Sequence, residues 1–247
     1  MSRRTLLYSA WTLSALVATA CGGRGAVPGR PTANSQVIAP DAIRDFSVLY
    51  AKNCSGCHGS DGKGGAAIGI GDPVYLAIAN DATINNVIAD GLAGTSMPAF
   101  ARHSGGMLTD GQIHVIVRGI RARWGEPDAL RGAMPPPYAA PGSGDPKRGA
   151  TVYGSYCSSC HGADGHGSTR ASAIVDGSYL ALVSDQNLRT TVIVGRPELG
   201  APDWRGNIPG KPMSPEDVSD VVAWLASQRP PLAGQSFSRL RTEGGMR

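Results

Sequence analysis

Apolar residues recur at a helical spacing in several stretches of the chain, and polar or glycine-rich segments separate these stretches. Two of them open with a helix-start signal, at Thr109 and at Ser214, and then place their apolar residues on one side. These residues are Ile113, Ile116, Val117 and Ile120 in the first stretch, and Val218, Val221, Val222 and Leu225 in the second. The alternation typical of strands is nearly absent, so the pattern predicts an all-α fold.

Four further segments carry helix signals. Asp41 is the predicted cap of one amphipathic helix, and Asp145 caps another that has Pro146 at its first helical position. Shorter helices are predicted at 81–90 and at 185–194. The chain therefore offers two sets of about three helices each.

A short motif occurs twice and decides the organisation of the chain. The segment 54–64 begins Cys-Ser-Gly-Cys-His-Gly, and the segment 157–167 begins Cys-Ser-Ser-Cys-His-Gly. The displacement between the copies stays near 103 residues over about 40 positions, which indicates tandem duplicated domains. Asp72-Pro73-Val74-Tyr75-Leu76 and Asp176-Gly177-Ser178-Tyr179-Leu180, for example, occupy matching places downstream of the motifs.

The amino terminus resembles an export signal. Arg3 and Arg4 precede an apolar stretch, and Ala18-Thr19-Ala20-Cys21 resembles a bacterial lipobox, which predicts lipidation of Cys21. Ordinary cleavage before a free thiol is the alternative. The predicted organisation is a signal peptide over 1–20, a flexible tether over 21–40, a first domain over 41–125, a Pro/Gly-rich linker over 126–143, a second domain over 144–229, and a tail over 230–247.

The repeated motif has the form C-x-x-C-H, the attachment signature of c-type haem. Its spacing places both thiols on one helical turn, with the adjacent histidine carried beneath the iron. The motif predicts covalent haem c at Cys54 and Cys57, and a second haem c at Cys157 and Cys160. A zinc site would need further Cys or His at ligand spacing within each copy, and a thioredoxin-like pair would need a βαβ setting; neither is found in the sequence.

On these motifs the chain resembles the class I cytochrome c family in its tandem di-haem form. The resemblance implies two domains, each wrapped around a haem, with His58 and His161 as proximal iron ligands. It also implies a methionine ligand from a later loop, and Met97, in Ser96-Met97-Pro98-Ala99-Phe100, matches that loop. The loop around Asp72 is expected to supply the carbonyl that receives the proximal imidazole N–H.

The second copy departs from the family pattern, because Ala201 stands where the ligand methionine is expected. Met213 is the leading candidate for the second iron, from a loop lengthened by glycine and proline, at the place of Met107 in the first copy. A five-coordinate haem with an open face is a second interpretation. A histidine ligand such as His166 is a third.

Composition narrows the class of function. The formal net charge of +4, without a basic stripe, is too small for a nucleic-acid-binding surface. No apolar run approaches the ~18 residues of a membrane span. The 34 glycines and 18 prolines predict a loop-rich fold, and three helices with long loops build too thin a core unless a large apolar cofactor completes it.

We expect an electron carrier or electron-transfer subunit rather than an enzyme, because His/Met ligation raises the iron potential and closes the iron to other ligands. The expected role is a periplasmic-side, lipid-tethered relay of single electrons between respiratory or photosynthetic complexes, with redox protein partners such as a cytochrome bc-type complex, a terminal oxidase or a dehydrogenase. One alternative is the haem-bearing subunit of a periplasmic dehydrogenase. Another is small-ligand or peroxidase chemistry at an open second haem, with Asp203 or His166 as the acid–base group.

Overall fold

The computed structural model describes residues 38–230 of the chain. The predicted signal peptide, Cys21, most of the tether and almost all of the tail lie outside the described residues. Within 38–230 the regular structure is helical, with two isolated bridges and no named strand, as the hydrophobic pattern predicted. None of the helices in this range is long and apolar enough to cross a membrane.

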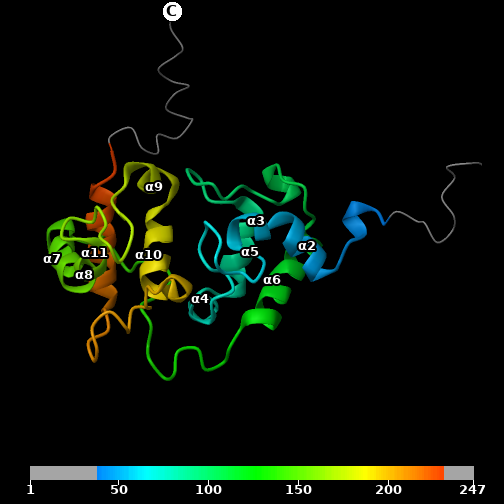
Figure 1. Ribbon diagram of the computed structural model, residues 1–247. Coiled ribbons are helices and arrows are strands. Elements are labelled where there is room, and N and C mark those ends of the chain that lie inside the picture. Colours follow the sequence, from blue (N-terminus) through cyan, green and yellow to red (C-terminus); the bar gives the residue numbers. More distant parts are fainter. Residues whose placement is uncertain (1–37, 231–247) are drawn as a thin grey trace, which may run out of the picture. The chain divides into compact units, whose positions relative to one another are not determined.

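The helices fall into two sets that follow the sequence repeat (Figure 1). The first set comprises α2 (Phe46–Asn53), α3 (Ser55–His58), α4 (Pro73–Ile78), α5 (Asp81–Asp90) and α6 (Asp110–Trp124), with 3-10 turns η2 (Pro40–Ala42) and η3 (Arg102–Ser104). The second set comprises α7 (Pro146–Tyr156), α8 (Ser158–His161), α9 (Gly177–Leu182), α10 (Asp185–Val194) and α11 (Pro215–Ser227), with the turn η4 (Pro197–Leu199).

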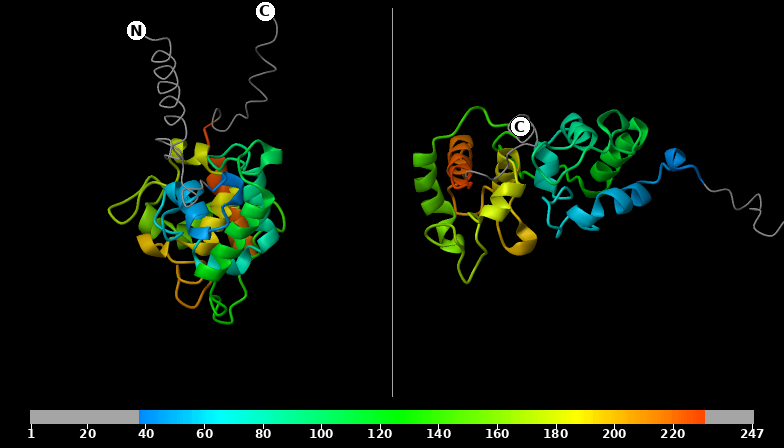
Figure 2. Two further views of the ribbon diagram at one scale, coloured as in Figure 1. Left: turned by 90° about the vertical axis from the view of Figure 1, so that its right-hand side faces the viewer. Right: turned by 90° about the horizontal axis from the view of Figure 1, so that it is seen from above.

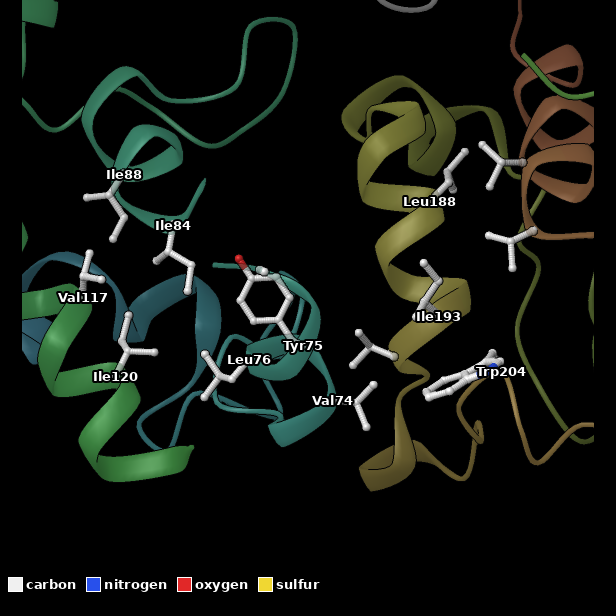
Figure 3. Packing of buried hydrophobic residues seen from close by; sticks show 14 of the residues in the cluster. Val74, Tyr75, Leu76, Ile84, Ile88, Val117, Ile120, Leu188, Ile193 and Trp204 are labelled. Carbon is white, nitrogen blue, oxygen red and sulfur yellow. The ribbon is translucent and has the colours of Figure 1, made fainter. Parts of the chain in front are cut away.

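Each set is built around its last long helix. In the first domain α6 contacts both α2 and α5, and in the second α11 contacts both α7 and α10 (Figures 1 and 2). Ile84 and Ile88 of α5 lie over Val117 and Ile120 of α6 (Figure 3). These side chains are buried, as the one-sided apolar pattern requires, and their removal from water is the main force that holds the helices together.

The first and last long helices of each domain cross at a glycine, but the glycine lies on opposite partners. In the first domain a Cβ on Gly119 of α6 would lie 2.0 Å from the Phe46 ring of α2. In the second domain the glycine is Gly149 of α7, and a Cβ there would lie 2.0 Å from the Asp220 carbonyl oxygen and 2.7 Å from Trp224 Cβ. Each crossing thus joins a large residue to a residue without a side chain, which allows the helices to approach closely.

Most predicted helix starts agree with the structure, but one does not. The capping box at Thr109, the cap at Asp145 and the helices at 81–90 and 185–194 are all present. Asp41, however, lies in a 3-10 turn, and the cap of α2 is Asp45, whose carboxylate accepts from Val48 N. The prediction at Asp41 was wrong because two aspartates precede the same apolar face and only the later one is followed directly by helix.

The short helices α4 and α9 were missed, although each has a local signal. Asp72 caps α4 and Pro73 is its first residue, and Asp176 caps α9 in the same way. Both helices have six residues, too short for a hydrophobic period to show. Arg121 closes α4 by donating to the Leu76 and Ala79 carbonyl oxygens, and Arg229 does the same at α9.

The linker between the domains is ordered against the second domain. The buried guanidinium of Arg189 on α10 donates to the carbonyl oxygens of Pro137 and Tyr138 and to Ser219 Oγ. Burial lowers the pKa of Arg189 from its ordinary value. Pro136 is fully buried, so this part of the linker is packed structure rather than a free connection.

Candidate functional site

The cysteine motif folds in the same way in both copies. Helix α2 ends at Asn53, Cys54 takes a cap conformation, and α3 then carries the motif through to the histidine. His58 N donates to Cys54 O at 3.0 Å, and His161 N donates to Cys157 O at 3.0 Å. Both thiols of each motif and the imidazole are therefore held on a single turn of helix, as the sequence spacing predicted.

The imidazole of each motif is oriented by one backbone carbonyl. His58 Nδ1 lies 2.8 Å from Ile68 O, and His161 Nδ1 lies 2.8 Å from Ser172 O. With Nδ1 as the donor, Nε2 is the unprotonated nitrogen that a metal ligand requires. Burial lowers the pKa of His58, against the hydrogen bond to Ile68, which raises it. The first histidine is therefore held in the neutral form.

The carbonyl that receives the imidazole comes from Ile68, four residues before Asp72 in the expected loop. Ile68 makes the contact, and Asp72 instead caps α4 through hydrogen bonds to Val74 N and Tyr75 N. Its carboxylate satisfies the amino end of the helix, which explains why an aspartate stands directly before a proline there. The side chains of Ile68 and Ser172 do not indicate this role in the sequence, because the contact uses only the backbone oxygen of each residue.

A tyrosine and a left-handed glycine fix the turn after each histidine. Tyr50 OH donates to Gly59 O at 2.7 Å, and Tyr153 OH donates to Gly162 O at 2.5 Å. Gly59 has φ +81°, and a Cβ there would lie 1.8 Å from Lys63 O. The duplicated contacts show that the loop after the cysteine motif, and not only the motif itself, was kept in both copies.

The surroundings of Cys54 and Cys157 disfavour metal binding and disulfide exchange by these two thiols. All four described cysteines are free, and burial raises the pKa of Cys54 and of Cys157 to about 11, with the neighbouring cysteine as the smaller cause. Thiolates bind zinc and attack disulfides, so a raised pKa disfavours both uses. Among residues 38–230 no three His, Cys, Asp or Glu side chains gather at ligand distance. The zinc and thioredoxin-like alternatives therefore find no support in this part of the chain.

The loop after the middle helix shows which residue of the second copy corresponds to Met97. Leu92 N donates to Met97 O at 3.0 Å, and Arg196 N donates to Ala201 O at 2.9 Å. A left-handed glycine with φ near +70° precedes the loop in both copies, at Gly91 and Gly195. The backbone register thus places Ala201 at the position of Met97, as the sequence repeat predicted.

The register of Met213 differs from the one that the sequence suggested. Met213 directly precedes Ser214, the cap of α11, and its N–H donates to Trp204 O at 2.9 Å. In the first copy Leu108 directly precedes the cap Thr109, and its N–H donates to Phe100 O at 2.8 Å.

Met213 therefore occupies the place of Leu108, not that of Met107. Met213 is 2% exposed and Leu108 is 6% exposed, whereas Met107 is 81% exposed. The displacement between the copies is 104 residues at Met97 and Ala201 and 105 at the caps Thr109 and Ser214, and neither value pairs Met213 with Met107. The side chain of Met97, by comparison, is only partly buried.

The remaining candidates lie away from a common site. His103 is exposed and lies 3.5 Å from Asp90 and 3.6 Å from Asp110, and His166 is exposed. The Asp203 carboxylate is paired with the Arg205 guanidinium at 2.5 Å. Of the two alternative acid–base groups, Asp203 is thus paired with an arginine and His166 is exposed.

The residues of each motif fit a covalently bound haem c. Two free thiols and one imidazole nitrogen available to a metal stand on one turn, which is the donor set that the group requires. In addition, the Tyr156 hydroxyl, directly before Cys157, is the one buried side-chain polar atom of the described residues without a hydrogen-bond partner. This hydroxyl thus has no partner among the described residues beside the second motif.

Comparison with known proteins identifies the family. The sequence model of the family described as cytochrome c oxidase, cbb3-type, subunit III matches residues 41–118 and again residues 144–225. The chain therefore belongs to this family and carries two cytochrome c domains. It is a c-type cytochrome with covalently bound haem c, and its function is electron transfer with redox protein partners.

Among solved structures, the chain is similar to one from the Kuenenia stuttgartiensis reducing HAO-like protein complex Kustc0457/Kustc0458. The identity is 16%, the TM-score is 0.44, and the match covers 78% of this chain and 98% of that chain. No curated protein compared with the chain matches it.

Proposed function

We propose that the chain is an exported, membrane-tethered di-haem cytochrome that relays single electrons between redox complexes on the periplasmic side of a bacterial membrane. One haem c would be held by Cys54 and Cys57, with His58 and Met97 as its iron ligands. A second would be held by Cys157 and Cys160, with His161 as an iron ligand. When bound, haem c supplies a one-electron couple.

The observation that carries this proposal is the duplicated imidazole geometry. Each proximal histidine has its Nδ1 2.8 Å from a backbone carbonyl oxygen, and each does so from the end of a matching four-residue helix. The same imidazole orientation in both copies is what two haem-binding domains require. The protein around each motif binds and orients the group and keeps the imidazole in one tautomer.

The contact between the two domains supports exchange of electrons between the haems. Arg196, on the loop that contains Ala201, donates from Nη2 to Gly65 O at 2.9 Å, and Gly65 belongs to the loop that follows His58. Arg196 is itself paired with Glu198 at 2.5 Å. This hydrogen bond joins the loop after the first cysteine motif to the Ala201 loop of the second domain, and direct contact between the two domains favours a relay.

The tether and the partners rest on other features. The lipobox-like sequence before Cys21 supports export and lipidation, which would hold the cytochrome at a membrane surface. The description of its family as an oxidase subunit supports a terminal oxidase among its partners. A fixed place in such a complex and a freely diffusing carrier are both compatible with this role.

Haem content tests the proposal first. The full chain, produced with periplasmic cytochrome c maturation, is expected to carry two haems by pyridine haemochrome assay and by intact mass. The double variant C54S/C57S and its matched counterpart C157S/C160S are each expected to retain one. A wild-type chain with one haem or none, or a pair of variants with unchanged content, would contradict it.

Lipidation is tested separately. The variant Cys21→Ser is expected to move the protein from the membrane fraction to the soluble periplasmic fraction with both haems in place. If the variant stays in the membrane fraction, the anchor is not at Cys21. If the wild type is found in the soluble fraction, the tether is absent altogether.

A further inference from the structure

The two copies do not offer the iron the same residue on the side opposite the histidine. The hydrogen bonds Leu92 N to Met97 O and Arg196 N to Ala201 O place methionine and alanine at the same backbone position. Alanine lacks the Cγ, Sδ and Cε atoms of methionine. The second copy therefore has no sulfur at the point from which the first copy is expected to ligate its iron.

Met213 stands at the backbone position of Leu108, a residue whose side chain has no donor atom. Its backbone is fixed on one side by the bond to the carbonyl of the buried Trp204 and on the other by the capping box of α11 at Ser214. Its side chain fills the core position that Leu108 fills in the first copy. A methionine that takes the place of a leucine in a packed core is a common volume-conserving exchange and needs no ligand role.

Three other candidate donors of the second domain, Asp203, His166 and Lys211, are paired or exposed. The Asp203 carboxylate is bound to Arg205, whose guanidinium also donates to the Leu130 carbonyl oxygen. His166 is exposed, and it follows His161 by only five residues, too few to pass around the edge of a porphyrin. The Lys211 ammonium lies over the Tyr156 ring at 5.8 Å.

We propose that the second haem keeps an exchangeable sixth position that binds a small uncharged ligand, with carbon monoxide as the probe, while the first haem is closed by Met97. This inference rests on the proposed function, since it requires a haem in each domain. It assigns Met213 to the core and gives the two haems different tasks. The first haem only exchanges electrons, and the second exchanges electrons and binds a ligand.

Carbon monoxide bound per haem, measured on the dithionite-reduced full-length protein, tests the inference. Haem content is determined on the same sample by pyridine haemochrome, so that a missing haem is not mistaken for a closed one. With two haems per chain, the expected result is one carbon monoxide per chain. A chain with two haems and no carbon monoxide bound would overturn the inference, and a chain with fewer than two haems would instead overturn the proposed function.

Three variants identify the site. Ala201→Met is expected to lower the count from one to zero and to add a second sulfur-to-iron charge-transfer band in the oxidised near-infrared spectrum. Met97→Ala is expected to raise the count from one to two. Met213→Leu, which gives the second copy the side chain that the first copy has at Leu108, is expected to leave the count at one and the spectrum unchanged.

The same variants also give the results that would contradict the inference. If Met213→Leu raises the count or removes a charge-transfer band, Met213 is an iron ligand and the inference is wrong. If Met97→Ala leaves both the carbon monoxide count and the charge-transfer band unchanged, Met97 is not an iron ligand and the open position is at the first haem. The oxidised spectrum provides a readout that does not depend on electron-transfer activity.

Discussion

The loop that follows the cysteine motif and the loop that follows the middle helix have diverged to different extents between the two domains. Around the motif the tyrosine, the left-handed glycine and the imidazole-to-carbonyl bond are the same in both copies. On the later loop the backbone bonds are kept, but Met97 corresponds to Ala201 and Leu108 to Met213. On the proposed function, the first loop would hold the haem, and the second loop would determine whether its iron is open to a ligand.

At the helix crossings, too, the backbone arrangement is the same in both domains and the side chains differ. Phe46 packs on Gly119 in one domain, and Trp224 packs beside Gly149 in the other, so the large and small partners have changed places while the crossing remains. The pairing of a large residue with a glycine is therefore kept, and the identity of the residues is not. Substitutions at matched positions in the two domains test this difference.

The largest effect is expected from Gly149→Ala, because the added Cβ meets the Asp220 carbonyl at 2.0 Å and backbone cannot move aside cheaply. We expect a loss of about 3 kcal/mol or more in the free energy of unfolding of the second domain. The matched change Gly119→Ala meets a side chain, so its cost is about 1–3 kcal/mol. Guanidinium unfolding followed by circular dichroism measures both.

Relief by a second change distinguishes the two crossings. Phe46→Leu is expected to recover part of the stability lost in Gly119→Ala. Truncation of Trp224 is not expected to rescue Gly149→Ala, because the closest clash is with Asp220 O. An equal loss of unfolding free energy in the two glycine variants would contradict this account of the crossings. Equal recovery of stability by the two second changes would contradict it as well.

Arg189→Met is expected to cost the second domain about 2–3 kcal/mol, since the carbonyls of Pro137 and Tyr138 lose a charged donor while the aliphatic stem is kept. Limited proteolysis is expected to cut the linker faster. The matched position in the first domain is Asn85, and Asn85→Met serves as the control with little effect on either measurement. An unchanged rate of linker cleavage in Arg189→Met would contradict the packed linker.

The second domain is expected to be the more sensitive to acid. The Arg148 guanidinium bound to Asp220 lowers the pKa of that carboxyl below its ordinary value, and the first domain has Val115 at the same position. A lowered folded-state pKa adds stability above the ordinary aspartate pKa of about 4, and this stability is lost as pH falls through the folded value.

The variant Asp220→Asn isolates this contribution. It is expected to cost about 1.5–3 kcal/mol at neutral pH, since a charged hydrogen bond is lost. It should also flatten the fall in stability of the second domain below pH 4, measured by unfolding at a series of pH values. A variant with the same pH profile as the wild type would exclude Asp220 as the cause.

The smallest effect is expected at Met107, which is 81% exposed. Met107→Ala should change stability by less than about 0.5 kcal/mol and leave the spectra of both haems as they are. A clear change in the spectrum of either haem would mean that the register of the loop before α6 is wrong.

The sequence predicted the parts of the fold that depend on pattern and caps. The duplicated motif, the capping box at Thr109 and the helices at 81–90 and 185–194 all carry local signals, and the structure has them. The six-residue helices α4 and α9 were missed because they are shorter than two helical periods. The cap at Asp45 was missed because Asp41 offered the same chemistry four residues earlier.

The site was predictable where the chemistry lies in side chains and not where it lies in the backbone. Cys54, Cys57 and His58 were found from their spacing, but the carbonyl of Ile68 has no sequence signature. The register of Met213 could have been read from the sequence by counting back from the cap Ser214, since Leu108 stands directly before the cap Thr109. The match to Met107 paired the two methionines, although they are 106 residues apart and the two caps are 105 residues apart.

A potentiometric titration of the full-length protein, followed at the haem absorbance bands, is the sharpest test of the difference between the two domains. Because methionine ligation raises the iron potential, we predict two separate one-electron steps, the higher from the first haem and the lower from the second. Ala201→Met should raise the lower step toward the higher, and Met213→Leu should move neither. A single common potential for both haems, or a shift of the lower step in Met213→Leu, would contradict the assignment of different sixth positions to the two haems.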